Sequence, residues 1–257
     1  MTALPPTIVA ISLKMYFTHA RTLEWCRRVR GIADSHDAVG PDGTGLLVLP
    51  TFPALVGARE ILGDAVALGA QDVAVADHGP HTGEVGAPEL AEIGCTVAEI
   101  GHAERRAAGE DDSVVGAKVV AALRNGLVPL VCVGEATRTG PDAAAAGVAA
   151  ELDRVLAPAR DAGLLPAPLI VAYEPHWAIG APEPAPAEHV AAVCGRLRTE
   201  LDSVGGSTRV LYGGSAGPGL LGRLGGTVHG LFLGRSAHDP DAIVRVLDET
   251  TGREADT

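Results

Sequence analysis

The chain has 257 residues, which is enough for one barrel-sized domain or for two small ones. Hydrophobic residues make up 47% of it and aromatic residues only 3%, so we expect a packed globular protein with a core of Val, Leu, Ile and Ala. A net charge of −12 argues against nucleic acid or an anionic membrane as a partner, and a phosphate group would have to be bound by local groups such as backbone N–H.

Short apolar runs typical of buried strands alternate along the chain with segments of helical periodicity. The helical spacing of apolar residues is most regular in residues 23–32 and 190–204. The runs predicted to be strands are residues 8–13, 46–49, 66–70, 96–100, 127–133, 169–173, 209–212 and 230–233.

This alternation predicts right-handed βαβ units and an α/β fold with a parallel sheet. Eight units in about 250 residues favour a closed (β/α)8 barrel, with residues 1–257 forming a single domain. An open, doubly wound sheet is the alternative, but no G-x-G-x-x-G motif follows the first strand, where Lys14-Met15-Tyr16-Phe17 stand instead. The polar residues from about 250 to 257 are expected to form a frayed tail.

Four cysteines are spread over the chain without a C-x-x-C pair: Cys26, Cys95, Cys132 and Cys194. This spacing favours reduced, buried thiols in a cytoplasmic protein over a disulfide or zinc framework. The N-terminus lacks the basic and apolar regions of a signal peptide, and no apolar run approaches the 18 or so residues of a membrane span. We therefore expect a soluble protein.

Catalytic groups of such barrels lie where strands end, and three chemically useful side chains stand at these positions. The first strand leads into Lys14, the fourth into His102 and the sixth into Glu174. Lys14 is one of only two lysines against eighteen arginines, which favours a functional role. His102 on its own could equally cap or pack against the next helix, whereas Glu174 precedes a proline and cannot simply continue into a solvated helix. Together they suit proton transfer beside a carbonyl group.

Other segments around these strand ends fit a phosphorylated substrate. Gly-rich turns at residues 213–215 and 234–235 follow the seventh and eighth strands, where barrels commonly bind phosphate through backbone N–H groups. Residues 175–183 combine a proline, an apolar middle and small residues, which predicts a lid with an N–H at Gly180 facing the substrate; a fixed loop packed by Trp177 is the alternative. Arg105 and Arg106, beside Glu104, could form an exposed turn, form a structural ion pair below the site, or take part directly in the chemistry.

At these positions the chain resembles the triosephosphate isomerase family over nearly its whole length. Residues 14–15, 69–71, 82–85, 100–106 (Ile-Gly-His-Ala-Glu-Arg-Arg), 132–135, 172–180 (Ala-Tyr-Glu-Pro-His-Trp-Ala-Ile-Gly) and 212–215 carry the resemblance. It implies a cofactor-free and metal-free interconversion of dihydroxyacetone phosphate and glyceraldehyde 3-phosphate through an enediolate, a step of glycolysis and gluconeogenesis.

The resemblance also implies a role for individual residues. Glu174 would move the proton between the carbons, and neutral His102 would polarise the carbonyl and shuttle protons between the two oxygens. Lys14, oriented by Glu104, would offset negative charge. Cys132 would be a structural residue near the catalytic floor. The phosphate would be held by N–H groups of Gly180, Ser215, Gly234 and Arg235, and the loop containing Thr82 would project into the partner subunit of a homodimer.

Several positions depart from the family pattern. Ser12-Leu13 replaces Asn-Trp before the lysine, and because the Asn contacts substrate, Ser12 leaves more room in the pocket. Ala103 replaces Ser, Asp72 replaces Asn, Ala181-Pro182-Glu183 replaces Thr-Gly-Lys in the lid, and Gly234-Arg235 replaces Gly-Gly.

These departures leave three functions open. The leading expectation is isomerisation of three-carbon sugar phosphates. The alternative is the same proton transfer on a four-carbon ketose phosphate such as erythrulose phosphate, because Gly-Arg at the phosphate turn resembles a divergent branch of the family. A non-catalytic barrel that binds sugar phosphate is the third, and the presence of Lys14, His102 and Glu174 together argues against it.

Overall fold

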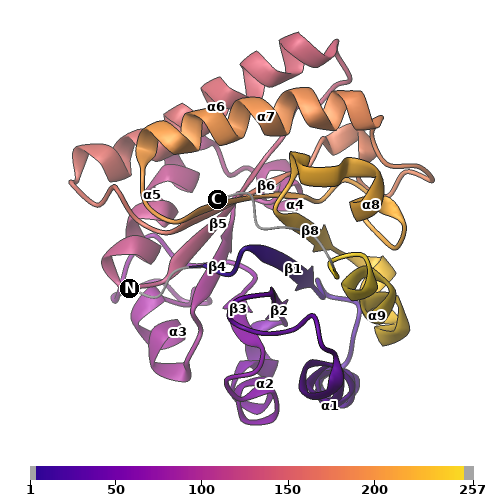
Figure 1. The fold of residues 1–257 in the computed structure, drawn as a ribbon. Coiled ribbons are helices and arrows are strands. Elements are labelled where there is room, and N and C mark those ends of the chain that lie inside the picture. The colour runs from indigo at the N-terminus through magenta and orange to yellow at the C-terminus, as the bar shows by residue number, and fades with distance from the viewer. Residues whose placement is uncertain (1–3, 252–257) are drawn as a thin grey trace.

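A computed structural model describes residues 4–251 of the chain. Eight parallel strands form a closed barrel in chain order, and helices surround it (Figure 1). β1 closes the barrel by pairing with both β2 and β8. The predicted (β/α)8 architecture is confirmed, and each predicted strand is present within two residues of its expected ends. The strands are β1 (Thr7–Ser12), β2 (Thr44–Leu49), β3 (Ala67–Ala70), β4 (Val97–Ile100), β5 (Val128–Val133), β6 (Leu169–Tyr173), β7 (Thr208–Tyr212) and β8 (Gly230–Leu233).

Some of the helices begin at positions where a side chain satisfies a free N–H group. The Thr18 hydroxyl accepts from the Arg21 N–H at the start of α1, and Asp111 does the same for Val114 in α5. Helices α6 and α7 lie side by side over one flank of the barrel (Figure 1). The α-helices are α1 (His19–Ser35), α2 (Leu55–Leu62), α3 (Ala87–Ile93), α4 (Ala103–Ala107), α5 (Asp112–Arg124), α6 (Pro141–Asp161), α7 (Ala187–Val204), α8 (Leu220–Leu224) and α9 (Pro240–Asp248), with short 3-10 helices η1 (Phe52–Ala54), η2 (His176–Ala178), η3 (Gly225–Thr227) and η4 (Arg235–His238).

The core has two layers, because successive strand residues point to opposite faces. Between strands and helices lies a large apolar layer, and a smaller one fills the barrel interior. The interior layer is Ile8, Ala10, Leu47, Leu49, Val97, Leu130, Cys132, Ile170, Ala172, Leu211 and Phe232. Continuing the same alternation toward the strand ends places Ser12, Glu99 and Glu174 on the interior face of β1, β4 and at the end of β6.

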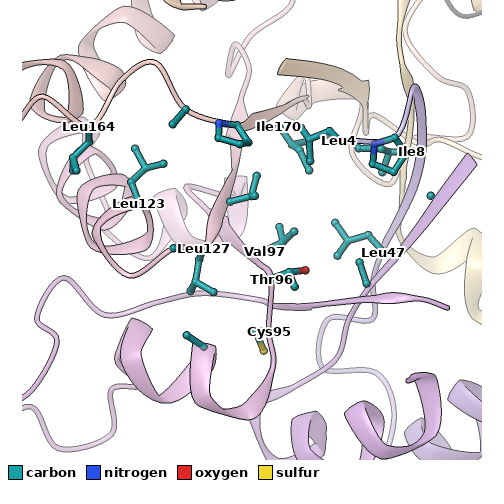
Figure 2. A pocket seen from close by; sticks show the side chains of 18 of the residues that line it. Leu4, Ile8, Leu47, Cys95, Thr96, Val97, Leu123, Leu127, Leu164 and Ile170 are labelled. Atoms are coloured by element: carbon teal, nitrogen blue, oxygen red, sulfur yellow. The ribbon is translucent and has the colours of Figure 1, made fainter. Parts of the chain in front are cut away.

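The opposite end of the barrel, at the strand N-termini, contains an apolar cavity of about 680 Å³. Leu47, Val97 and Ile170 contribute to its wall, together with Leu4 and Leu164 from outside the sheet (Figure 2). No charged side chain from residues 4–251 lines this cavity. Among the described residues, the titratable side chain of this cavity is the Cys95 thiol, and burial raises its pKa to about 11, so the cavity offers no base near neutral pH.

The structure bears on two further expectations, the frayed tail at residues 250–257 and the lack of a membrane-spanning segment. Thr250 is not part of a frayed tail, because it is buried and its hydroxyl is hydrogen-bonded to that of Thr44 at 2.8 Å. Residues 252–257 of the predicted tail lie outside the described residues. Over residues 4–251, no helix combines the length and the apolar character needed to cross a membrane.

Candidate active site

A second cavity, of about 430 Å³, opens at the C-terminal ends of the strands. Its wall brings together every residue that the sequence analysis placed in catalysis or substrate binding: Ser12, Lys14, His102, Glu104, Glu174, Gly180, Ser215, Gly234 and Arg235. Lid residues from Ile179 to Pro182 border it as well. Thr82 lies elsewhere, on an exposed loop, and Cys132 lies in the barrel interior. Within residues 4–251 no group of three or more His, Cys, Asp or Glu side chains is arranged to hold a metal ion.

His102 and Glu174 face each other at the base of this cavity. Nε2 of His102 is 3.5 Å from Oε2 of Glu174, and both side chains are buried. Because α4 starts directly after His102, the Glu104 N–H donates to Nδ1 of the imidazole at 3.2 Å. A neutral imidazole has one proton, and Nδ1 is already an acceptor, so the proton is on Nε2 and points toward the cavity.

Burial shifts the pKa values of this pair in opposite directions. Burial raises the pKa of Glu174 to about 7, and the Lys14 ammonium opposes part of that rise. Burial and the charge of Lys14 lower the pKa of His102 to about 4. Near neutral pH the imidazole is therefore uncharged, while the carboxyl group is poised to take up or release a proton.

Lys14 is held at the cavity edge by both its side chain and its backbone. Its Nζ is 2.8 Å from Oε1 of Glu104, which is the contact that the family resemblance implied. Its backbone has a φ of +49°, which is uncommon for a residue with a side chain, and the Gln71 amide donates to its carbonyl at 3.2 Å. Ser215, with a φ of +50°, is the other such non-glycine residue in the described chain. Both strained residues line the same cavity, as is typical of functional sites.

The Glu174 carboxyl group is closely packed against Cys132 and Gly213. The Cys132 thiol hydrogen-bonds to it from the neighbouring strand. A Cβ atom at Gly213 would lie 2.7 Å from Oε1 of Glu174, so glycine is required beside the carboxyl group. Its Oε2 atom is buried and has no hydrogen-bond partner among the described residues. That oxygen is therefore free to accept a proton from a ligand in the cavity.

Glu99 is a site residue that the sequence analysis missed. It lies on the inner face of β4, is 3% exposed, and accepts a hydrogen bond of 2.9 Å from the Ser12 hydroxyl. Burial and the nearby Glu174 carboxylate raise its pKa well above the ordinary value. The signal was present in the sequence, because an acidic residue interrupts the apolar run of residues 96–100.

The predicted lid is attached to the barrel at both of its ends. Glu135 accepts hydrogen bonds from Trp177 at 2.8 Å and from Tyr173 at 3.1 Å, and it lies 2.9 Å from His189. The Ser215 hydroxyl is within hydrogen-bond distance of the lid carbonyl oxygens of Ala178 and Ala181, at 2.7 and 2.9 Å. Motion of the segment stays a prediction, but these contacts define what an opening motion has to break. Nothing in the isolated sequence marked Glu135 as the centre of this network.

Gly180 and Arg235 meet at the cavity edge. Gly180 has a φ of +71°, and a Cβ atom there would lie 3.3 Å from a guanidinium nitrogen of Arg235. The Arg235 side chain is thus close to the lid, at the start of η4, with the rest of the residue exposed to solvent. The guanidinium adds a positive charge on the side of the cavity where the Gly-rich turns lie.

Arg105 and Arg106 both form structural ion pairs, which is one of the alternatives that the sequence left open, and Arg105 lies 3.1 Å from Asp72. Arg106 forms ion pairs of 2.8 Å with both Asp112 and Glu151, and its Nε donates to the Gly101 carbonyl. Lys118, the second lysine of the chain, is buried against Asp72 at 2.6 Å. These ion pairs support the loop that carries His102 without entering the cavity.

Comparison with known proteins agrees with this geometry. The family model for triosephosphate isomerase matches residues 7–250. An L-erythrulose-1-phosphate isomerase from Pectobacterium atrosepticum is 45% identical over 245 residues, covering 94% of each chain. A triosephosphate isomerase from Alkalilimnicola ehrlichii is 40% identical over 230 residues, 85% of this chain and 89% of the relative. An L-erythrulose-1-phosphate isomerase from Mesorhizobium japonicum is 36% identical over 250 residues, 93% and 95% of the two chains. The chain therefore belongs to the triosephosphate isomerase family and is an isomerase.

Proposed function

We propose that this enzyme isomerises a four-carbon ketose phosphate such as L-erythrulose 1-phosphate. The observation that carries the proposal is the 45% identity, over 94% of both chains, to a relative of that activity. The pocket supports it, because Ser12 stands where the family pattern has the larger Asn and so leaves room for a longer substrate. The comparisons thus favour the alternative of the sequence analysis over its leading expectation of a three-carbon substrate.

The reaction is a proton transfer between two neighbouring carbons. The Glu174 carboxylate removes the proton from the carbon next to the substrate carbonyl, and Nε2–H of His102 donates a hydrogen bond to the carbonyl oxygen. The resulting enediolate carries negative charge, which the Lys14 ammonium offsets. His102 passes the hydroxyl proton of the enediolate from one oxygen to the other. Glu174, now protonated, returns its proton to the other carbon, and the carbonyl group has moved by one position.

The fourth carbon changes the product but not this chemistry. In erythrulose 1-phosphate the carbonyl is on the second carbon, and the third carbon carries a hydroxymethyl group where a three-carbon substrate has a hydrogen. Moving the carbonyl to the third carbon therefore gives another ketose phosphate rather than an aldehyde. The extra hydroxymethyl group extends from the end of the substrate that is farthest from the phosphate.

The phosphate end is assigned to the opposite side of the cavity. N–H groups of Gly180, Ser215 and Gly234, with the Arg235 guanidinium beside them, suit a dianion that the net charge of −12 would otherwise repel. These residues come from the lid and from the turns after β7 and β8, so the lid and the phosphate site form one unit.

Isomerisation of dihydroxyacetone phosphate and glyceraldehyde 3-phosphate is the second candidate. It is favoured by the 40% identity to a triosephosphate isomerase and by the placement of Lys14, His102 and Glu174 in one cavity. A sugar-phosphate-binding barrel without activity is disfavoured by the same three side chains, because binding alone has no need for a buried carboxylate beside an imidazole.

Steady-state kinetics on both substrates with purified enzyme tests the proposal. We expect kcat/KM to be at least about tenfold higher on erythrulose 1-phosphate than on dihydroxyacetone phosphate, since contacts to one added polar group commonly discriminate by that much. A higher kcat/KM on the three-carbon substrate would establish the second candidate instead. Absence of turnover on both substrates would support the non-catalytic barrel.

We further propose that the enzyme is a cytoplasmic homodimer. The four cysteines are buried free thiols, in keeping with a reducing compartment. Residues 78–84, which include Thr82, form an exposed loop, and Met15 and Tyr16 are 91% and 54% exposed. Exposed apolar side chains of this size are typical of a surface that a second subunit covers.

A further inference from the structure

The strongest feature that the proposed mechanism leaves unused is the carboxyl group of Glu99. The residue lies two positions above Val97 on the inner face of β4, at the level where the interior apolar layer ends and the cavity begins. Only 3% of the residue is exposed, and an acidic side chain is seldom kept there without a partner or a task. The ion pairs below the His102 loop do not include it.

The partner of Glu99 is Ser12, which reaches it across the barrel interior from β1. The Ser12 hydroxyl donates to Oε2 of Glu99 at 2.9 Å, and Ser12 itself lines the cavity. A hydroxyl group has one proton to donate and two lone pairs with which to accept. Since Glu99 takes the proton, the Ser12 oxygen offers the cavity only acceptor lone pairs, in a fixed direction.

The surroundings of Glu99 disfavour the charged form of its carboxyl group. Burial and the Glu174 carboxylate both raise the pKa of Glu99 well above its ordinary value. The Ser12 hydroxyl and the Lys14 ammonium oppose part of this rise, so the contact with Ser12 is the hydrogen bond that favours the charged form of Glu99.

The direction of the pair also separates it from the phosphate end. Ser12 stands on β1, which pairs with β8, but its hydroxyl points across the interior toward β4, the strand that leads into His102. The proposed phosphate site is built from the turns after β7 and β8. The substrate part nearest to the Ser12–Glu99 pair is thus the end remote from the phosphate, where a four-carbon substrate carries its additional hydroxymethyl group.

We propose that Glu99 is a positioning residue for substrate length: through Ser12 it holds an acceptor oxygen that receives the terminal hydroxyl group of a four-carbon ketose phosphate. This inference rests on the proposed function, since a three-carbon substrate has no such hydroxyl group. A fixed acceptor discriminates strongly between a ligand with the matching hydroxyl and one without it, because the unmatched acceptor is left without a partner.

The test compares the specificity ratio, which is kcat/KM on erythrulose 1-phosphate divided by kcat/KM on dihydroxyacetone phosphate. A loss of folded or active enzyme cancels in this ratio, so a purely structural effect leaves it unchanged. Glu99→Leu and Ser12→Ala should each lower the ratio by about tenfold, and the double variant should lower it no further, because the two residues act as one unit. Glu99→Gln keeps an acceptor for Ser12 and should keep the ratio within about threefold.

Val97→Ala is the matched control, because Val97 lies on the same strand and the same face but lines the cavity at the other end. It should lower the melting temperature and leave the ratio unchanged. Equal losses on both substrates in Glu99→Leu, or additive effects of Glu99→Leu and Ser12→Ala, would overturn the positioning role. If the wild-type enzyme does not turn over the four-carbon substrate, it is the proposed function that fails, and that result is obtained before any variant is made.

Discussion

Glu174 is a carboxyl group held where water cannot solvate its charge, and most of the site can be understood from that position. Burial of the carboxylate lowers the stability of the folded protein, but it also brings the pKa of Glu174 near the working pH. A base with such a pKa removes a carbon-bound proton most effectively. Cys132, Gly213 and His102 surround the Glu174 carboxyl group, and only Cys132 hydrogen-bonds to it among these three. The same burial makes the residue a source of instability in the folded state.

The pH dependence of kcat/KM should report this residue. Because burial raises the pKa of Glu174 to about 7, the base form is lost as the pH falls through that value, and kcat/KM should fall tenfold per pH unit below it. His102, with a pKa of about 4, stays neutral throughout. Lys14→Met removes the charge that favours the carboxylate and should move the acid limb to higher pH. An acid limb that stays in place would contradict this role of Lys14.

A second residue-scale prediction concerns stability. Between pH 4.5 and about 7 the folded protein keeps a proton on Glu174 that the unfolded chain releases, so stability falls as the pH rises through this window. Glu174→Gln should remove that loss. We expect it to lower kcat about a thousandfold and to raise the free energy of unfolding at pH 8 by about 3 kcal/mol, with no difference below pH 4.5.

Urea unfolding at both pH values measures this effect. Glu60→Gln makes the same chemical change at an exposed position of α2, and it should leave the free energy of unfolding unchanged. A Glu174→Gln variant that is less stable than the wild type at pH 8 would show that the carboxylate is stabilised in the folded state.

At the scale of elements, the lid and the β7 loop share one hydrogen-bonding hydroxyl group. The Ser215 hydroxyl is within hydrogen-bond distance of the carbonyl oxygens of Ala178 and Ala181. These contacts hold the lid against the loop after β7, which we propose binds the phosphate group. The other end of the lid is held through Trp177 and Glu135. Just beyond the lid, the Ala185 N–H donates to the Tyr212 hydroxyl at 2.8 Å. A segment held at its ends by so few side-chain hydrogen bonds is suited to open and close.

Ser215→Ala should remove the contacts of this hydroxyl group with the lid without adding backbone strain, because alanine and serine have similar preferences at a φ of +50°. We expect faster amide hydrogen exchange in residues 178–182 and a loss of about tenfold in kcat/KM. Ser236→Ala is the control, since its hydroxyl group donates to Ala216 and not to the lid. If lid exchange were equally fast in wild type and Ser215→Ala, the hydroxyl group would not control opening.

The elements and the site differ in how far the sequence predicts them. Strand positions follow from local apolar runs, and Lys14, His102 and Glu174 could be found because each stands next to a strand end. Glu99 and Glu135 could not be assigned roles, because their partners Ser12, Trp177 and His189 are far away in sequence. Thr250 was misplaced for the same reason, since only the folded chain brings Thr44 beside it.

At the scale of the whole molecule, we expect subunit association to depend on the exposed loop of residues 78–84. Thr82→Arg places a charge where the partner subunit would enclose it, and an unpaired charge in an interface should weaken the dimer by about a hundredfold. Sedimentation velocity over a range of concentrations measures the shift. Thr139→Arg, in the exposed loop after β5, should leave association unchanged. A wild-type protein that sediments as a monomer would rule out the proposed dimer.

The apolar cavity at the strand N-termini has a consequence for how this protein can change over time. Val97 borders that cavity, and Glu99 lies two residues further along the same strand. Val97 contributes to core packing, whereas Glu99 contacts Ser12 in the wall of the active-site cavity. Mutations that fill the apolar end, such as Ala167→Val, can therefore add stability without touching selectivity. A higher free energy of unfolding would then offset the loss caused by destabilising mutations in the active-site cavity. New substrate preferences can therefore arise while the barrel remains folded.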